Sequence, residues 1–128
     1  MKKIFAGLTC VLGFWMASAA YAHHSGAGFD RAKTVTLVGT VKTFRWANPH
    51  SWIEMEVANE KGATETWNVE MTSPAVLIRA GWKSSTIKPG DRVSVQAHPL
   101  QTGEPGGLFM SVTLADGATF TDKAPPTK

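Results

Sequence analysis

Histidine is the residue type in this chain that is best suited to chemistry, and the four histidines are His23, His24, His50 and His98. A neutral imidazole is the commonest protein ligand for a metal ion. The one cysteine, Cys10, lies in an apolar run near the N-terminus, so the remainder of the chain offers no competing thiolate. All four histidines are therefore candidate metal ligands, and a set of nitrogen ligands favours copper.

The first 22 residues have the pattern of a cleavable signal peptide. A basic start is followed by an apolar run over residues 4–16 and by small residues up to Ala22. The run is too short to anchor the protein in a bilayer and no second apolar stretch follows, so no membrane span is expected. We expect cleavage between Ala22 and His23, which predicts a periplasmic or secreted protein.

The position of cleavage decides how the N-terminus would bind a metal ion. Cleavage after Ala22 leaves His23 with a free amine, so its amine and ring can chelate one metal ion, and a second imidazole can complete a T-shaped set of nitrogens. Cleavage after Ala20 instead places His23 third in the chain, an arrangement that surrounds Cu(II) or Ni(II) with square-planar nitrogens. Both outcomes favour copper as the cofactor.

The elements that must position His50 and His98 are short strands, because apolar and polar residues alternate between frequent turn residues. Five strands are expected, and Gly39 in the first marks a bend or a close approach of two backbones. The residues expected to face the core, strand by strand, are Val35, Leu37 and Val41; Ile53, Met55 and Val57; Trp67, Val69 and Met71; Val93, Val95 and Ala97; and Leu108, Met110, Val112 and Leu114.

One short helix is predicted between the third and fourth strands. Ser73 is its N-cap and Pro74 its first residue, and the segment 75–80 ends at Gly81. A type II turn over residues 88–91 then leads into the fourth strand. This order is typical of a five-stranded OB-like barrel, an all-β fold with one short helix. A small open β-sandwich built from the same strands is the alternative.

Length and charge limit the classes of function that remain. With 128 residues, 43% of them hydrophobic, the chain suits a single domain, here residues 23–120 followed by a flexible tail over 121–128. Removal of Lys2 and Lys3 lowers the net charge from +3 to +1, and the other basic residues are scattered, so nucleic-acid binding is not expected. The sequence contains no glycine-rich phosphate loop or nucleophile elbow, which predicts a binding protein and not an enzyme.

Two loops of the predicted barrel frame the usual binding face of an OB fold. His50 lies in the loop 47–51 after the first strand, and His98 precedes the loop 99–107 after the fourth. In the fourth strand His98 falls on the outward-facing positions, so it is not expected in the core. A specific metal site is the sharpest hypothesis, although His50 could equally serve to hydrogen-bond the backbone.

Aromatic residues suggest an alternative function. Trp46 and Trp52 flank the first loop, and Phe109 falls on the outward-facing positions of the fifth strand. Exposed rings beside a barrel mouth can stack on a ligand. These three residues and the two loops would then bind a protein, glycan or other small-molecule partner, while the histidines would be incidental.

Several short motifs resemble a known family. They are His23-His24-Ser25 with Phe29-Asp30, Gly39-Thr40-Val41, Asn48-Pro49-His50-Ser51-Trp52, Gly81-Trp82, Pro89-Gly90-Asp91 and His98-Pro99-Leu100. The pattern resembles a family of small exported bacterial proteins of unknown function over almost the whole chain after the signal peptide, which implies one exported domain. More loosely, the strand with Gly39 and the turn Pro89-Gly90-Asp91 are similar to periplasmic bacterial OB-fold proteins, whose members are binding modules.

Overall fold

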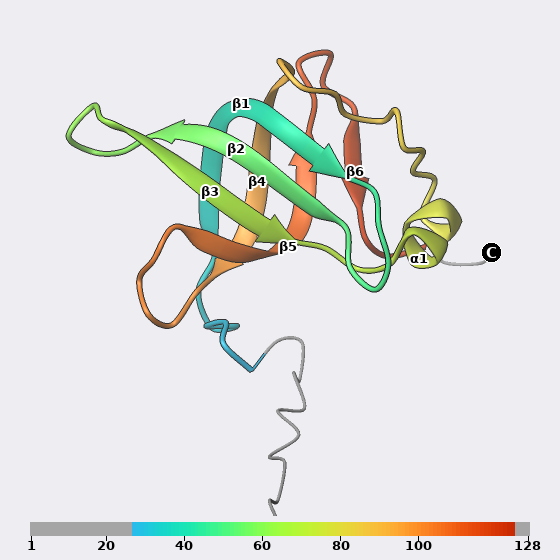
Figure 1. Ribbon diagram of the computed structural model, residues 1–128, viewed down its shortest axis with the longest axis horizontal. Coiled ribbons are helices and arrows are strands. Elements are labelled where there is room, and N and C mark those ends of the chain that lie inside the picture. Colours follow the sequence, from blue (N-terminus) through green and yellow to red (C-terminus); the bar gives the residue numbers. More distant parts are fainter. Residues whose placement is uncertain (1–26, 125–128) are drawn as a thin grey trace, which may run out of the picture.

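The computed structural model describes residues 27–124, so the predicted signal peptide and both His23 and His24 lie outside the described residues. Six strands and one helix follow one another along the described part (Figure 1). Their bounds are β1 (Val35–Arg45), β2 (Trp52–Ala58), β3 (Thr64–Glu70), α1 (Pro74–Arg79), β4 (Arg92–Pro99), β5 (Gly106–Thr113) and β6 (Thr119–Thr121).

The strands form one curved sheet that closes on itself. Their order is β3-β2-β1-β4-β5-β6, with every neighbouring pair antiparallel. A parallel pairing of β3 with β5, in which Val69 lies opposite Gly107, joins the two sides of the sheet. This pairing closes the predicted five-stranded OB-like barrel, and the open sandwich is wrong because it would leave these two edges apart.

The barrel interior is filled by the alternating residues of the first four strands, as the sequence predicts. Ile53, Met55, Val69 and Val95 are wholly buried. Gly39 is also buried, and it lies opposite Val57 where β1 pairs with β2. A Cβ atom at this position would collide with the carbonyl oxygen of Glu56. The close backbone approach expected at Gly39 is therefore confirmed.

The helix and the turn after it form where their local sequence predicts them. Helix α1 has Ser73 as its N-cap and Pro74 as its first residue. Gly81, just after the helix, has a φ of +91°, which is typical of a glycine that ends a helix. Leu77 is buried while Ile78 is exposed, so one face of α1 covers an end of the barrel (Figure 1). In the turn at residues 88–91, Gly90 has a φ of +93°, as a type II turn requires.

Strand β5 does not alternate as predicted. Phe109 is only 3% exposed and Val112 is wholly buried, whereas Leu108 and Met110 are half-buried. The prediction that Leu108 and Met110 face the core, with Phe109 outside, is therefore wrong.

A β-bulge in β5 explains the change. Gln96 of β4 pairs with Ser111, whereas the next residue, Ala97, pairs with Phe109. Met110 is thus the extra residue, and the alternation of side chains on its two sides is out of phase. Phe109 before the bulge and Val112 after it can therefore both face the core.

The C-terminal part also differs from expectation. Pro99 belongs to β4 and Gly106 begins β5, so the loop expected over 99–107 is shorter. Strand β6 was not predicted, and its last residue, Thr121, falls in the segment expected to be a flexible tail. Across residues 27–124, no helix has the length and apolar character needed to cross a membrane.

Candidate metal and ligand site

The connection from β1 to β2 holds the His50 ring against the end of β3. Its Nδ1 lies 2.9 Å from the carbonyl oxygen of Met71 and 3.4 Å from Oε1 of Glu70. A carbonyl oxygen only accepts hydrogen bonds, so Nδ1 carries the proton and donates it. In the neutral ring, this leaves the Nε2 lone pair as the nitrogen that can bind a metal ion.

The ring of His98, near the end of β4, is held in the same way. Its Nδ1 donates to the carbonyl oxygen of Lys33 at 2.7 Å, a residue that lies just before β1. His98 is half-buried on the outer face of β4, as predicted. Here too the proton on Nδ1 leaves Nε2 as the acceptor.

The two histidines line adjoining hollows on the outside of β5. His98 lines a hollow of about 520 Å³, and His50 lines a second of about 210 Å³. We call the two together the β5 groove. The residues that line both hollows are Arg31, Leu108, Phe109 and Asp122.

The β5 groove exists because the closing edge of the barrel is interrupted. Strand β3 pairs with residues 106–108 of β5, and β6 pairs with residues 111–113 on the same edge. Phe109 and the bulged Met110 lie between these two pairings and have no paired strand on this edge, although Phe109 pairs with Ala97 of β4 on the other edge. The groove is therefore a consequence of the bulge and of the short β6.

The segment before β1 forms one side of this region. The Asp30 N–H donates to the carbonyl oxygen of Pro99 at 2.8 Å, and the Gln101 N–H donates to that of Gly28 at 2.9 Å. The hydrogen bond from the Lys33 ammonium, at 3.2 Å, lowers the pKa of Asp30, and a hydrogen bond from the Ala32 N–H lowers it further. These bonds attach the start of the described chain next to His98.

The described residues do not by themselves complete a metal centre. Over residues 27–124, no group of three or more His, Cys, Asp or Glu side chains is placed to hold a metal ion. His50 and His98 are thus two oriented imidazoles on one groove. A metal bound there would need ligands from elsewhere in the chain.

Two of the three aromatic candidates pack inside the fold. Phe109 lies in the core, with its ring centroid 5.6 Å from that of Trp82. Trp46 is half-buried against the core and meets Phe44 edge-on at 5.8 Å. Phe109 is therefore a core residue and not the exposed ring that was expected, although it also lines both hollows of the β5 groove. Trp46 shows only structural contacts among the described residues.

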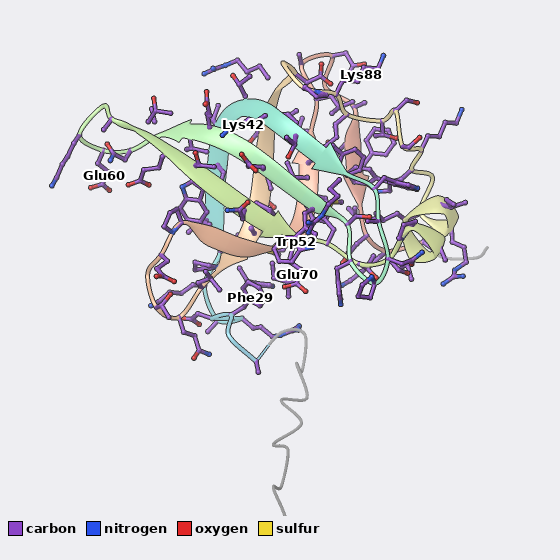
Figure 2. The ribbon with its side chains drawn as sticks, in the orientation of Figure 1. Phe29, Lys42, Trp52, Glu60, Glu70 and Lys88 are labelled. Atoms are coloured by element: carbon purple, nitrogen blue, oxygen red, sulfur yellow. The ribbon has the colours of Figure 1, made fainter. Side chains whose placement is uncertain are left out.

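Trp52 remains on the outer face of the sheet. It lies opposite Arg45 of β1 and Glu70 of β3, and the Arg45 Cζ sits 5.6 Å from the centre of its ring. Figure 2 shows Trp52 and Glu70 together on this side, with Phe29 of the N-terminal segment below them. Hollows of about 260 and 340 Å³ border Trp52, and the second is formed by the loop that carries His50.

A family model described as "Family of unknown function (DUF6152)" matches residues 13–110 of the chain. The chain belongs to this family. The predicted resemblance is thereby confirmed. In this DUF6152 protein the match includes all four histidines and the bulge in β5, whereas β6 and Asp122 lie after it.

No curated protein matches this DUF6152 chain. Among solved structures, it is similar to two crystal forms of the mitochondrial single-stranded DNA binding protein Rim1 from S. cerevisiae. Form 2 has a TM-score of 0.47 at 12% identity and covers 67% of this chain and 97% of that chain. Form 1 has the same TM-score and identity, and the match covers 74% of this chain and 98% of that chain.

Sequence reasoning missed Arg31 and Asp122, the two charged residues that line both hollows. Arg31 lies before the first strand and Asp122 after the last. No local pattern marks either residue, because only the closure of the barrel brings the two ends of the domain to one groove.

Proposed function

We propose that this protein is an exported, non-catalytic barrel that binds copper through histidine. The observation that carries the proposal is that His50 and His98 line one groove, each donating from Nδ1 to a main-chain carbonyl. Metal-ligating histidines are usually held by such a bond, which fixes the ring and leaves the other nitrogen for the metal. Both rings are thus oriented before any metal binds, which reduces the entropy lost on binding.

The remaining ligands are the amine and ring of His23, exposed by cleavage after Ala22. The bond between Gln101 and Gly28 holds the start of the described chain beside the loop that follows His98. An extended chain from His23 to Gly28 spans at most about 17 Å, so His23 can reach ligands within that distance of Gly28. Its amine and ring with one barrel imidazole give three nitrogens, a set that suits copper, and His24 is an accessory ligand.

The test is a Cu(II) titration of the processed chain that begins at His23, in competition with a chelator of known affinity. Copper should bind with one ion per chain and quench tryptophan fluorescence to saturation. A one-residue extension before His23 should weaken binding, and so should His98→Ala or His50→Ala, whichever imidazole is the ligand. His24→Ala is the matched control, and it should have a smaller effect.

A peptide covering residues 23–30 separates the shared site from simple binding at the N-terminus. If the barrel imidazoles contribute, the folded protein should bind copper more tightly than this peptide. Equal affinity in the two would contradict the shared site and favour the second candidate function.

That second candidate is the binding of a protein or glycan partner through Trp52. It is favoured by the position of Trp52 between two hollows on a polar sheet face that carries Glu54 and Asn68. Trp52→Ala should then abolish binding to the partner while copper affinity is unchanged. A loss of copper affinity in Trp52→Ala, but not in His98→Ala, would contradict the copper site.

A further inference from the structure

We infer that the β5 groove binds a small apolar molecule that ends in a carboxylate, and that Arg31 holds the carboxylate. This inference is independent of the proposed copper site, although His98 lines the same groove. It rests on the size of the groove, on an apolar floor that the barrel leaves uncovered, and on the charges at its rim.

The larger hollow has the size of a small-molecule site. Its volume of about 520 Å³ falls within the range of about 300–1,000 Å³ that is usual for ligand pockets. The smaller hollow extends it past Arg31 toward His50. Hydroxyl and amide groups line the wall of the larger hollow, from Gln96, Ser111, Thr119 and Thr121.

The floor of the groove is apolar on the outside of the barrel. Leu108 and Met110 are half-buried there because the bulge in β5 turns Phe109, and not its neighbours, into the core. The Met110 sulfur has only a weak polar contact, with Oγ1 of Thr34 at 3.7 Å. Leu108 and Met110 thus give the groove an apolar lining with polar groups around it, as is usual for small-molecule sites.

The rim of the larger hollow carries more positive than negative charge at neutral pH. Arg31 and Lys123 line this hollow, with Asp122 as its one carboxylate, whereas Glu70 lines only the smaller hollow. Asp30 near His98 is already paired with Lys33 at 3.2 Å. The larger hollow therefore suits an anionic group better than a cationic one.

Arg31 is the residue best placed to hold that anion. Within residues 27–124 the lysine–carboxylate ion pairs are Lys33–Asp30 and Lys42–Glu54, and Glu70 lies beside the His50 ring. Among these residues the exposed guanidinium of Arg31 has no paired carboxylate. A guanidinium binds a carboxylate through two parallel hydrogen bonds. Because Arg31 lines both hollows, a carboxylate bound to it leaves the apolar part of the ligand on Leu108 and Met110.

The experiment uses the processed chain in EDTA, so that no metal takes part, and three probes with one eight-carbon chain: octanoate, 1-octanol and octylammonium. Calorimetric titration gives the affinities, and amide NMR shifts show the location. Octanoate should bind about tenfold more tightly than octanol, as a charged hydrogen-bonded pair implies, and octylammonium more weakly still. The shifts should centre on Arg31 and Met110 and not on Trp52.

Two variants and a control assign the roles. Arg31→Gln should lower the affinity for octanoate to that for octanol and leave the affinity for octanol unchanged. Met110→Gln should lower the affinities for both octanoate and octanol. The control Arg79→Gln removes an exposed arginine of α1 and should change neither affinity.

Three results would overturn the inference: no binding of octanoate, equal affinities for octanoate and octanol, or an unchanged octanoate affinity in Arg31→Gln. Because every titration is made without metal, failure here leaves the copper proposal standing. A protein that binds octanoate but no copper would likewise contradict only the copper proposal.

Discussion

The indole Nε1 of Trp82 donates a hydrogen bond of 2.7 Å to the main-chain carbonyl oxygen of Thr121. This bond attaches β6 to the segment that follows α1, at the centre of a cluster of aromatic rings. The ring of Trp82 lies 5.4 Å from Phe120 and 6.0 Å from Phe44, centroid to centroid. The last strand is thus held by one buried tryptophan as well as by its pairing with β5.

We expect Trp82→Phe to lower the free energy of unfolding by about 1–3 kcal/mol, because it removes the hydrogen bond and leaves unfilled space. Urea denaturation measures the change, and hydrogen exchange at Ser111 and Thr113, which pair with β6, should accelerate. Trp67→Phe is the control, since Trp67 is half-buried with no hydrogen bond from its ring among the described residues. Equal losses in the two variants would contradict the role of the bond.

Gly39→Val should lower the free energy of unfolding by about 1–3 kcal/mol, the usual range for overpacking. A Cβ atom at this position would collide with the Glu56 carbonyl oxygen, with the Glu56 carbonyl carbon at 3.0 Å and Val57 Cγ2 at 3.2 Å. Because the atoms in the way belong to the backbone of β2, they cannot move aside as the end of a flexible side chain could, and the strand itself would have to shift. Thermal and urea denaturation measure the effect.

Gly28→Ala is the matched control for Gly39, because a Cβ atom at position 28 meets nothing within 4 Å. This control should change stability by no more than a few tenths of a kcal/mol, as surface substitutions do. An unchanged stability in Gly39→Val would show that β1 and β2 do not approach closely at this point.

Phe109→Ala should cost about 3–5 kcal/mol of stability, because it empties a core position beside Trp82. Trp52→Ala removes a larger ring from the outer face and should cost less. Denaturation of both variants distinguishes a core aromatic residue from a surface one. A smaller loss in Phe109→Ala than in Trp52→Ala would restore the outward position predicted from simple alternation.

The pKa of Asp30 should lie below its ordinary value of 3.8, because the Lys33 ammonium donates a hydrogen bond to it. A folded pKa below the unfolded one stabilises the protein above the unfolded pKa, and this contribution disappears as the pH falls through the folded pKa. Lys33→Ala should raise the Asp30 pKa, measured by NMR titration of its carboxyl carbon. Lys61→Ala, at an exposed turn, should leave it unchanged.

The sequence alone determined those features of the structure that depend on short segments of the chain. The cap and proline of α1, the glycine after it and the turn around Gly90 are set by backbone angles that neighbouring residues prefer. The alternation in β1 to β4 likewise marks the buried face, because each strand has a period of two residues. It also placed His98 outside the core.

Only the tertiary structure decided the features that join distant segments. The bulge at Met110 depends on the register of β5 against β4, and the closure depends on the pairing of Val69 with Gly107. The acceptors for His50 and His98 lie 21 and 65 residues away in the chain. Periodicity carries no information about such partners, because they meet only when the sheet closes. The same closure brings Arg31 to the β5 groove.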